Sequence, residues 1–225
     1  MLKFSAVTPA LPASRARRGR GFTLLELMVG LSIVAISLAI VAPGFAGWIQ
    51  NSRVRSYAES MQNAVQFARA EAVRRNTPVT FQITSTLDNT CSVVTTGNYW
   101  VVSAGSTNAA SACGTLVSDP TSSTISAASS GPFILKKGPP ETSLNGASLT
   151  ATQSAITFNG LGRQTADSGA AVALTTYQIT STNGTCVAAG GAVRCLNIVV
   201  SPAGQMRMCD PSLTSTATNN DPMAC

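Results

Sequence analysis

The chain has 225 residues and a formal net charge of +6, enough for one domain of modest size together with an extended element. Five of the fifteen basic residues precede Phe22, and from Asn76 onward five basic residues face six acidic ones. The main part of the chain therefore lacks the basic field that drives general binding to phosphate backbones. The sequence has no histidine, which excludes a Ser-His-Asp catalytic arrangement.

The N-terminal segment combines a basic leader with a long apolar run. From Phe22 to Ala42 there are 21 residues with a single charge, Glu26. At a helical rise of about 1.5 Å per residue, this run matches a hydrocarbon core about 30 Å thick. We therefore expect residues 1–21 to be a leader, residues 22–42 to be a transmembrane helix and the basic end to stay cytoplasmic. The basic residues of the leader are Lys3, Arg15, Arg17, Arg18 and Arg20.

Two other interpretations of this segment remain open. An ordinary secretory signal peptide has a shorter apolar run and a small-residue cleavage site of the A-x-A type, which is missing here. A plain signal anchor accounts for the whole segment except Glu26, because a carboxylate costs roughly 2.5–3.5 kcal/mol at mid-membrane and less near the surface. Glu26 should therefore have a partner.

Residues 43–77 are expected to continue the helix as an amphipathic stalk. Pro43 removes one backbone hydrogen bond and lets the helix bend or open at that point. Beyond it, apolar residues recur at alternating spacings of four and three, which predicts one narrow buried stripe. Arg55–Glu59 and Glu71–Arg75 have the i, i+4 spacing of helical ion pairs, and Asn76 with Pro78 should end the helix. The stripe consists of Val54, Ala58, Met61, Val65, Ala68 and Ala72.

Residues 78–225 predict a β-rich head. Short runs of β-branched and aromatic residues alternate with turn residues, as in antiparallel sheets. Residues 103–131 are nearly uncharged and low in complexity, so we expect a long loop or a disordered insertion there. The predicted strands cover residues 79–84, 98–102, 133–137, 155–158, 175–180, 196–200 and 205–208.

The six cysteines indicate disulfides in an oxidising compartment. An even count, no C-x-x-C pair and no histidine favour disulfides over a metal site. Fifteen pairings are possible, and proximity in sequence suggests Cys91–Cys113, Cys186–Cys195 and Cys209–Cys225. We expect no metal and no other cofactor.

The N-terminal sequence "RGRGFTLLELMVGLSIVAI" resembles the signal of type IV pilins and of the pseudopilins of type II secretion. The resemblance implies cleavage by a prepilin peptidase after Gly21 and N-methylation of Phe22. It also implies that Glu26 pairs with the N-terminal ammonium of a neighbouring subunit, a strong interaction in a low-dielectric setting. Family members carry a proline near Pro43, where the resemblance implies that the helix loosens on polymerisation.

Three further segments resemble signatures of the GspH/FimT branch of minor pilins and pseudopilins: "ARAEAVRRNTPV", "ITFNGLGR" and "IVVSPAGQMRMC". The resemblance leaves roughly residues 87–149 unmatched. It implies an α+β, pilin-like fold, in which a long N-terminal helix, half transmembrane and half amphipathic, packs on a β-rich, disulfide-bonded head.

Some members of this branch bind DNA through a C-terminal G-R-x-R sequence. The matching positions here are Gly204 to Arg207, and Gln205 replaces the first arginine. One phosphate contact is therefore missing, and a strand of a hairpin held by Cys209–Cys225 is the favoured interpretation. Arg194 and Arg207 remain the candidate DNA contacts.

The resemblance predicts a structural subunit and no enzyme. Its partners would be other pilin or pseudopilin subunits, prepilin peptidase and the bacterial inner membrane, with a single span and a periplasmic head that enters a pilus or pseudopilus. Three alternatives to a priming or tip subunit of a type IV pilus stay open: a type II secretion pseudopilin, a DNA-binding pilin for natural transformation, and an anchored periplasmic hydrolase.

Overall fold

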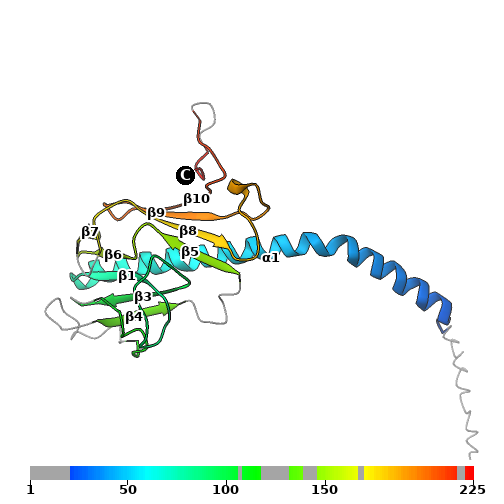
Figure 1. Ribbon diagram of the computed structural model, residues 1–225, viewed down its shortest axis with the longest axis horizontal. Helices are drawn as coiled ribbons and strands as arrows, with labels where there is room; N and C mark the ends of the chain where they lie inside the picture. Colours follow the sequence, from blue (N-terminus) through cyan, green and yellow to red (C-terminus); the bar gives the residue numbers. More distant parts are fainter. Residues whose placement is uncertain (1–20, 106–107, 118–131, 139–145, 167–169, 217–220) are drawn as a thin grey trace, which may run out of the picture. The chain divides into compact units, whose positions relative to one another are not determined.

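The computed structural model describes residues 21–105, 108–117, 132–138, 146–166, 170–216 and 221–225, with the side chains of all of these except 40–44 and 46. The expected leader, residues 1–20, thus lies outside the described residues. The chain forms two compact units, of which the first ends at Pro43 and the second is Gly44–Cys225. The second unit contains both sheets (Figure 1).

A single helix, α1 (Leu24–Arg75), runs through the N-terminal third of the chain. All six residues of the predicted stripe are fully buried, so this prediction is confirmed. Tyr57 and Ala64 are also buried and widen the stripe, because residues three and four positions apart share one helix face. This face packs into one core with side chains of both sheets, including Phe81, Tyr177 and Ile198.

The helix ends at Arg75, as the sequence predicted, through its backbone geometry. Asn76 adopts a left-handed conformation with φ of 52°. The Thr77 amide donates to the Ala72 carbonyl at 3.3 Å, and the Asn76 amide donates to the Val73 carbonyl at 3.4 Å. This is the Schellman pattern, in which an asparagine tolerates the left-handed position. A side chain at Gly160 would collide with Asn76, so a glycine is required where the β6–β7 turn meets the helix end.

The head consists of two antiparallel five-stranded sheets (Figure 1). In the first the order is β4-β3-β1-β6-β7 and in the second it is β10-β9-β8-β5-β2. The strands of the first sheet are β1 (Val79–Thr84), β3 (Tyr99–Ala104), β4 (Phe133–Gly138), β6 (Ala155–Phe158) and β7 (Gln164–Thr165). Those of the second are β2 (Thr96–Gly97), β5 (Ala147–Ala151), β8 (Thr175–Ser181), β9 (Leu196–Val200) and β10 (Met206–Cys209).

All seven predicted strands are present: three have the predicted ends, and the ends of the other four differ by one or two residues. The sequence did not predict β2, β5 and β7. Two of them have two residues each, and β5 is built from the weak strand formers of "ASLTA". A one-turn 3₁₀ helix, η2 (Val187–Ala189), follows Cys186.

The prediction of one long loop over residues 103–131 is wrong at its start. Ser103 and Ala104 belong to β3. Residues 108–117 form a turn region whose Ala109 and Cys113 are buried, and the Ala109 amide donates to the Gln82 side-chain oxygen at 2.7 Å. A disulfide and a small satellite core with Ile134 hold this region on β1 and β4. Residues 106–107 and 118–131 lie outside the described residues.

The structure pairs the cysteines as proximity suggested: Cys91–Cys113, Cys186–Cys195 and Cys209–Cys225. The bridges span 22, 9 and 16 residues. Each closes a short loop, and a bridge of this kind typically stabilises a fold by about 2–4 kcal/mol, chiefly through the unfolded chain.

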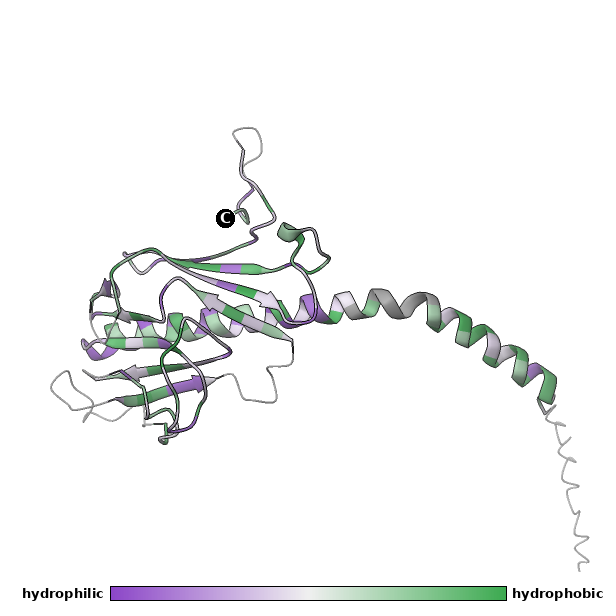
Figure 2. Ribbon diagram, viewed as in Figure 1, coloured by the Kyte–Doolittle hydropathy of each residue, from purple (hydrophilic) through white to green (hydrophobic). Residues whose placement is uncertain are grey.

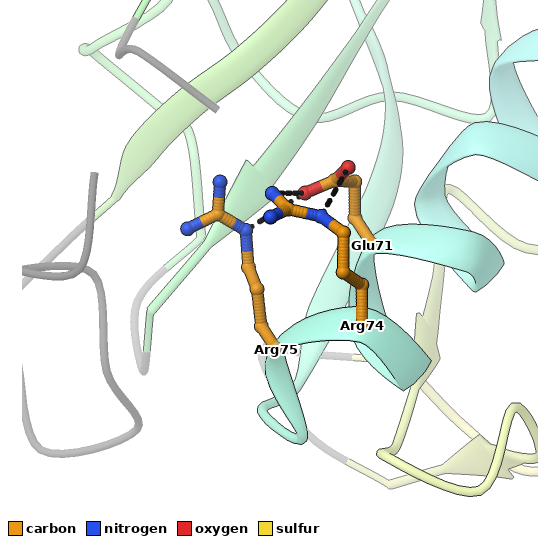
Figure 3. Close-up of polar contacts among 3 residues, drawn as sticks. All are labelled: Glu71, Arg74 and Arg75. Atoms are coloured by element: carbon orange, nitrogen blue, oxygen red, sulfur yellow. Dashed lines mark hydrogen bonds and ion pairs between the residues drawn. The ribbon is translucent and has the colours of Figure 1, made fainter. Parts of the chain in front are cut away.

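A buried carboxylate near the end of α1 binds two arginines (Figure 3). The Glu71 carboxylate accepts two hydrogen bonds from Arg74, at 3.1 and 2.7 Å, and one from Arg75 Nε at 2.8 Å. The Glu71 side chain is 10% exposed and that of Arg75 is 6% exposed. Burial acts to raise the pKa of Glu71, but the hydrogen bonds and positive charges of Arg74 and Arg75 outweigh it, and the pKa is lowered. Glu71–Arg75 thus confirms the expected pair, and Arg55–Glu59 forms at 3.0 Å.

We expect the substitution Glu71→Gln to lower the free energy of unfolding of the Gly44–Cys225 unit by about 3 kcal/mol at neutral pH, because it removes the charged acceptor of the hydrogen bond from the buried Arg75. Since the folded-state pKa of Glu71 lies below its ordinary value, its stabilisation is present at neutral pH and is lost as the pH falls through that pKa. The difference between the two proteins should therefore shrink in acid. Denaturant unfolding at a series of pH values measures it.

The matched control is Glu59→Gln, which removes a carboxylate whose side chain is 53% exposed and should cost less than about 1 kcal/mol. Equal losses for the two substitutions would contradict a special role of the buried pair. The unit is suitable for this test because every residue of its main core lies at Val54 or beyond.

Candidate functional site

The helix begins directly after the expected cleavage site. Thr23 precedes Leu24, the first helical residue, and its side-chain oxygen accepts a hydrogen bond from the Glu26 amide at 3.2 Å. Thr23 is therefore the N-cap, and the spacing T-x-x-E is that of a capping box. This role of Thr23 was not predicted, although the T-x-x-E spacing in the sequence is the signal for it. Glu26 also places a negative charge in the first turn, where the helix dipole favours it.

Phe22 and Glu26 share one side of this helix start. Both line a shallow groove, together with Leu27, Gly30, Leu31 and Val34. Within the described residues, Glu26 forms no ion pair. The structure therefore places the two residues expected to act in assembly on one surface.

The first half of α1 exposes apolar side chains in every direction. Each described side chain from residue 21 to residue 39 is exposed, and the segment is predominantly hydrophobic (Figure 2). A helix that is apolar all round is stable when another apolar environment covers it. Within the described part of the chain, no helix is both long and apolar enough to cross a membrane. Residues 40–42 of the expected span have no described side chains.

Pro43 does not interrupt the helix. The backbone remains helical from Leu24 to Arg75, so the structure shows no opening of the kind that the proline allows. The Pro43 side chain lies outside the described residues.

The three signature segments of the head meet around Arg69. Arg69 Nε donates to the Gly162 carbonyl at 3.0 Å. A side chain at Gly204 would collide with this same carbonyl, so the turns after β6 and β9 stack closely. The Gln164 amide donates to the Pro202 carbonyl at 3.0 Å. These contacts tie the helix to both sheets.

A groove of about 370 Å³ lies where the start of the second unit meets the C-terminal segment. Arg194 lines this groove, and its amide donates to the Asn51 side-chain oxygen at 2.8 Å. Arg207 does not line it: this arginine lies on β10 and donates to the Cys225 carbonyl at 3.1 Å. The two candidate DNA contacts therefore have different surroundings. The groove is lined by Trp48, Asn51, Ser52, Arg55, Arg194, Leu196, Asp210, Leu213 and Met223.

Residues 196–209 form the β-hairpin that we expected here in preference to a DNA-binding segment. β9 and β10 pair antiparallel, and the Gly204 amide closes the turn by donating to the Ser201 carbonyl at 2.8 Å. The Cys209–Cys225 bridge holds the following segment. Among the described residues, no group of three or more Cys, Asp or Glu side chains is placed to hold a metal ion.

Two family profiles match the chain. The family described as "Type II transport protein GspH" matches residues 57–204, and the family described as "Prokaryotic N-terminal methylation motif" matches residues 16–42. The GspH match includes the part that the signatures left unmatched. None of the curated proteins matches the chain.

Two solved structures are similar to the chain, both crystal structures of the type IV minor pilin FimU of Pseudomonas aeruginosa strain PAO1. The form in space group P21 is 16% identical, with a TM-score of 0.43, and the match covers 72% of this chain and 91% of FimU. The form in P65 is 18% identical, with a TM-score of 0.40, and the match covers 68% and 90%.

The GspH match spans more than half of the chain, and the methylation motif covers the predicted processing site and the apolar helix. The chain therefore belongs to the GspH family, the minor pilins and pseudopilins that its signatures indicated.

Proposed function

We propose that this minor pilin primes or caps a type IV pilus, after a prepilin peptidase cleaves its leader between Gly21 and Phe22. The observation that carries the proposal is the first half of α1, where exposed apolar side chains surround one carboxylate that has no ion-pair partner within the described residues. Such a surface needs a lipid bilayer first and the helices of other subunits afterwards.

Glu26 would select the neighbouring subunit. Cleavage before Phe22 leaves an N-terminal ammonium, and the helices of a growing filament provide a low-dielectric setting. An ion pair there is strong, while an unpaired charge is heavily penalised. The desolvation cost of the carboxylate of an incoming subunit would thus be offset when this carboxylate forms an ion pair with the ammonium of the neighbouring subunit.

The membrane and the compartment follow from the same proposal. The arginines of the leader would keep the N-terminus cytoplasmic, residues 22–42 would span the inner membrane, and the head would fold in the periplasm. The three disulfides support an oxidising compartment for the head. We assign no catalytic step to this subunit.

A type II secretion pseudopilin is the second candidate, since it uses the same membrane and assembly physics with other partners. The FimT-like signature and the long cysteine-containing tail favour the pilus. The hydrolase alternative requires a different maturation, so a mature chain that begins at Phe22 supports the pilin and any other N-terminus counts against it.

The substitution Glu26→Gln tests the ion pair separately from the helix cap. Glutamine also fits the third position of a capping box but carries no charge. We expect normal cleavage of the leader and a strong loss of incorporation into sheared filaments. The same result is expected for Glu26→Ala. Immunoblots of filament and membrane fractions measure both. Thr23→Ala is the control that weakens only the cap, and normal incorporation of Glu26→Gln would contradict the ion pair.

Deletion of the gene distinguishes the two filament types. For a type IV pilus subunit, we expect the amount of pilus sheared from the surface to fall and a plasmid copy to restore it. Unchanged pili together with reduced release of exoproteins would instead identify a type II secretion pseudopilin.

The DNA-binding alternative predicts a role for Arg194 and Arg207. The Gly44–Cys225 unit has ten basic and eight acidic residues, a nearly balanced charge, so we expect it to retard DNA weakly in a gel, and equally so when both arginines are alanine. A strong, salt-dependent shift that the double substitution abolishes would overturn this expectation and favour DNA uptake.

A further inference from the structure

The second unit begins with an exposed apolar face on α1. Phe45 is 58% exposed, Trp48 67% and Ile49 40%, and the spacing i, i+3, i+4 places them on one side of the helix. The rings of Phe45 and Trp48 contact each other edge to face, with centroids 6.4 Å apart. None of these residues belongs to the core of the head, which begins at Val54. We call Phe45, Trp48 and Ile49 the aromatic collar.

The surroundings of the collar are amphipathic. Trp48 also lines the groove near the C-terminal segment, together with apolar Leu213 and Met223 and the exposed arginines Arg55 and Arg194. The groove has one acidic lining residue, Asp210, which is 4% exposed and whose carboxylate accepts hydrogen bonds from the Ser212 amide and hydroxyl. Arg55 forms an ion pair with Glu59, which does not line the groove. The accessible charges that line the groove are therefore cationic.

The position of the collar along the chain indicates what covers it. Phe45 and Trp48 follow Ala42, the end of the apolar run, by three and six residues. At about 1.5 Å per residue these steps correspond to roughly 5 and 9 Å along a helix. The polar layer on each side of a bilayer is about 5–8 Å thick. A span that ends at Ala42 would therefore place Phe45 within this layer and the backbone of Trp48 at its outer edge. Because helical side chains tilt toward the N-terminus, the Trp48 ring would lean back into the layer, where tryptophan and other amphipathic rings are enriched.

We propose that the aromatic collar binds the headgroup layer of the phospholipid bilayer and fixes the depth at which the head sits before assembly. The inference rests on the proposed membrane span of residues 22–42. Extraction of the subunit into a filament must then release Trp48 from the membrane interface, so the collar opposes premature extraction.

Trp48 reports on its own position, because the other tryptophan, Trp100, is 2% exposed inside the head. The full chain is reconstituted in phosphatidylcholine vesicles that contain phosphatidylglycerol. The lipids carry bromine either near the glycerol or near the ends of the acyl chains. We expect bromine near the glycerol to quench most of the Trp48 emission and bromine near the chain ends to quench it much less. The variant Trp48→Phe gives the residual emission of Trp100.

Three matched variants, each built on Trp48→Phe, calibrate the depth. Phe45→Trp should be quenched more by the deep label than Trp48 is, and Leu161→Trp, at an exposed turn of the head, should not be quenched. Leu31→Trp tests insertion of the apolar segment. If Leu31→Trp is quenched by the deep label but Trp48 behaves like Leu161→Trp, the collar faces a neighbouring subunit or water, and the inference fails alone. If Leu31→Trp is not quenched either, the proposed membrane span fails with it.

Discussion

A single continuous helix must satisfy two different surroundings, and the rest of the structure depends on this constraint. From residue 21 to residue 39 every described side chain of the helical region is exposed, whereas beyond Val54 one stripe is completely buried. A folded head can cover the second half, because a narrow stripe needs only one packed face. It cannot cover the first half, whose apolar side chains point in all directions. In the proposed function, lipid or other subunits would cover that half.

Contacts near the end of α1 hold the second half of the helix on the head. Arg69 ties α1 to the turn after β6, which itself stacks on the turn after β9. Glu71, Arg74 and Arg75 add a mostly buried ionic cluster at the end of the helix. A buried pair is weak evidence for stability in itself, since its desolvation cost is high. All three residues lie on α1, so the cluster stabilises the last turn of the helix rather than its position on the sheets.

The sequence predicted the elements that have a strong local signal. The stripe from Val54 to Ala72 was predictable because helical periodicity repeats several times, and β1 because six residues in a row favour a strand. β5 was not, since "ASLTA" becomes a strand only through its pairing with β8 and β2. The same holds for residues 108–117, which the Cys91–Cys113 bridge and Gln82 hold in place. The groove and the surroundings of Arg194 and Arg207 depend on the C-terminal segment after β10. No local sequence pattern predicts where that segment lies.

A comparison of free energies explains why a carboxylate rather than an amide occupies position 26. The N-cap that contributes about 0.5–2 kcal/mol to this helix start is Thr23, and a glutamine at position 26 would fit the capping-box spacing as well as Glu26 does. Its charge gains about 0.3–1 kcal/mol from the helix dipole, whereas a charge at mid-membrane costs roughly 2.5–3.5 kcal/mol, less near the surface. The stabilisation of the charge by the helix dipole therefore does not exceed the free-energy cost of placing the charge in the membrane. An ammonium in a low-dielectric setting adds several kcal/mol of attraction, so the proposed partner from another subunit would supply the stabilisation that the described part of the chain does not.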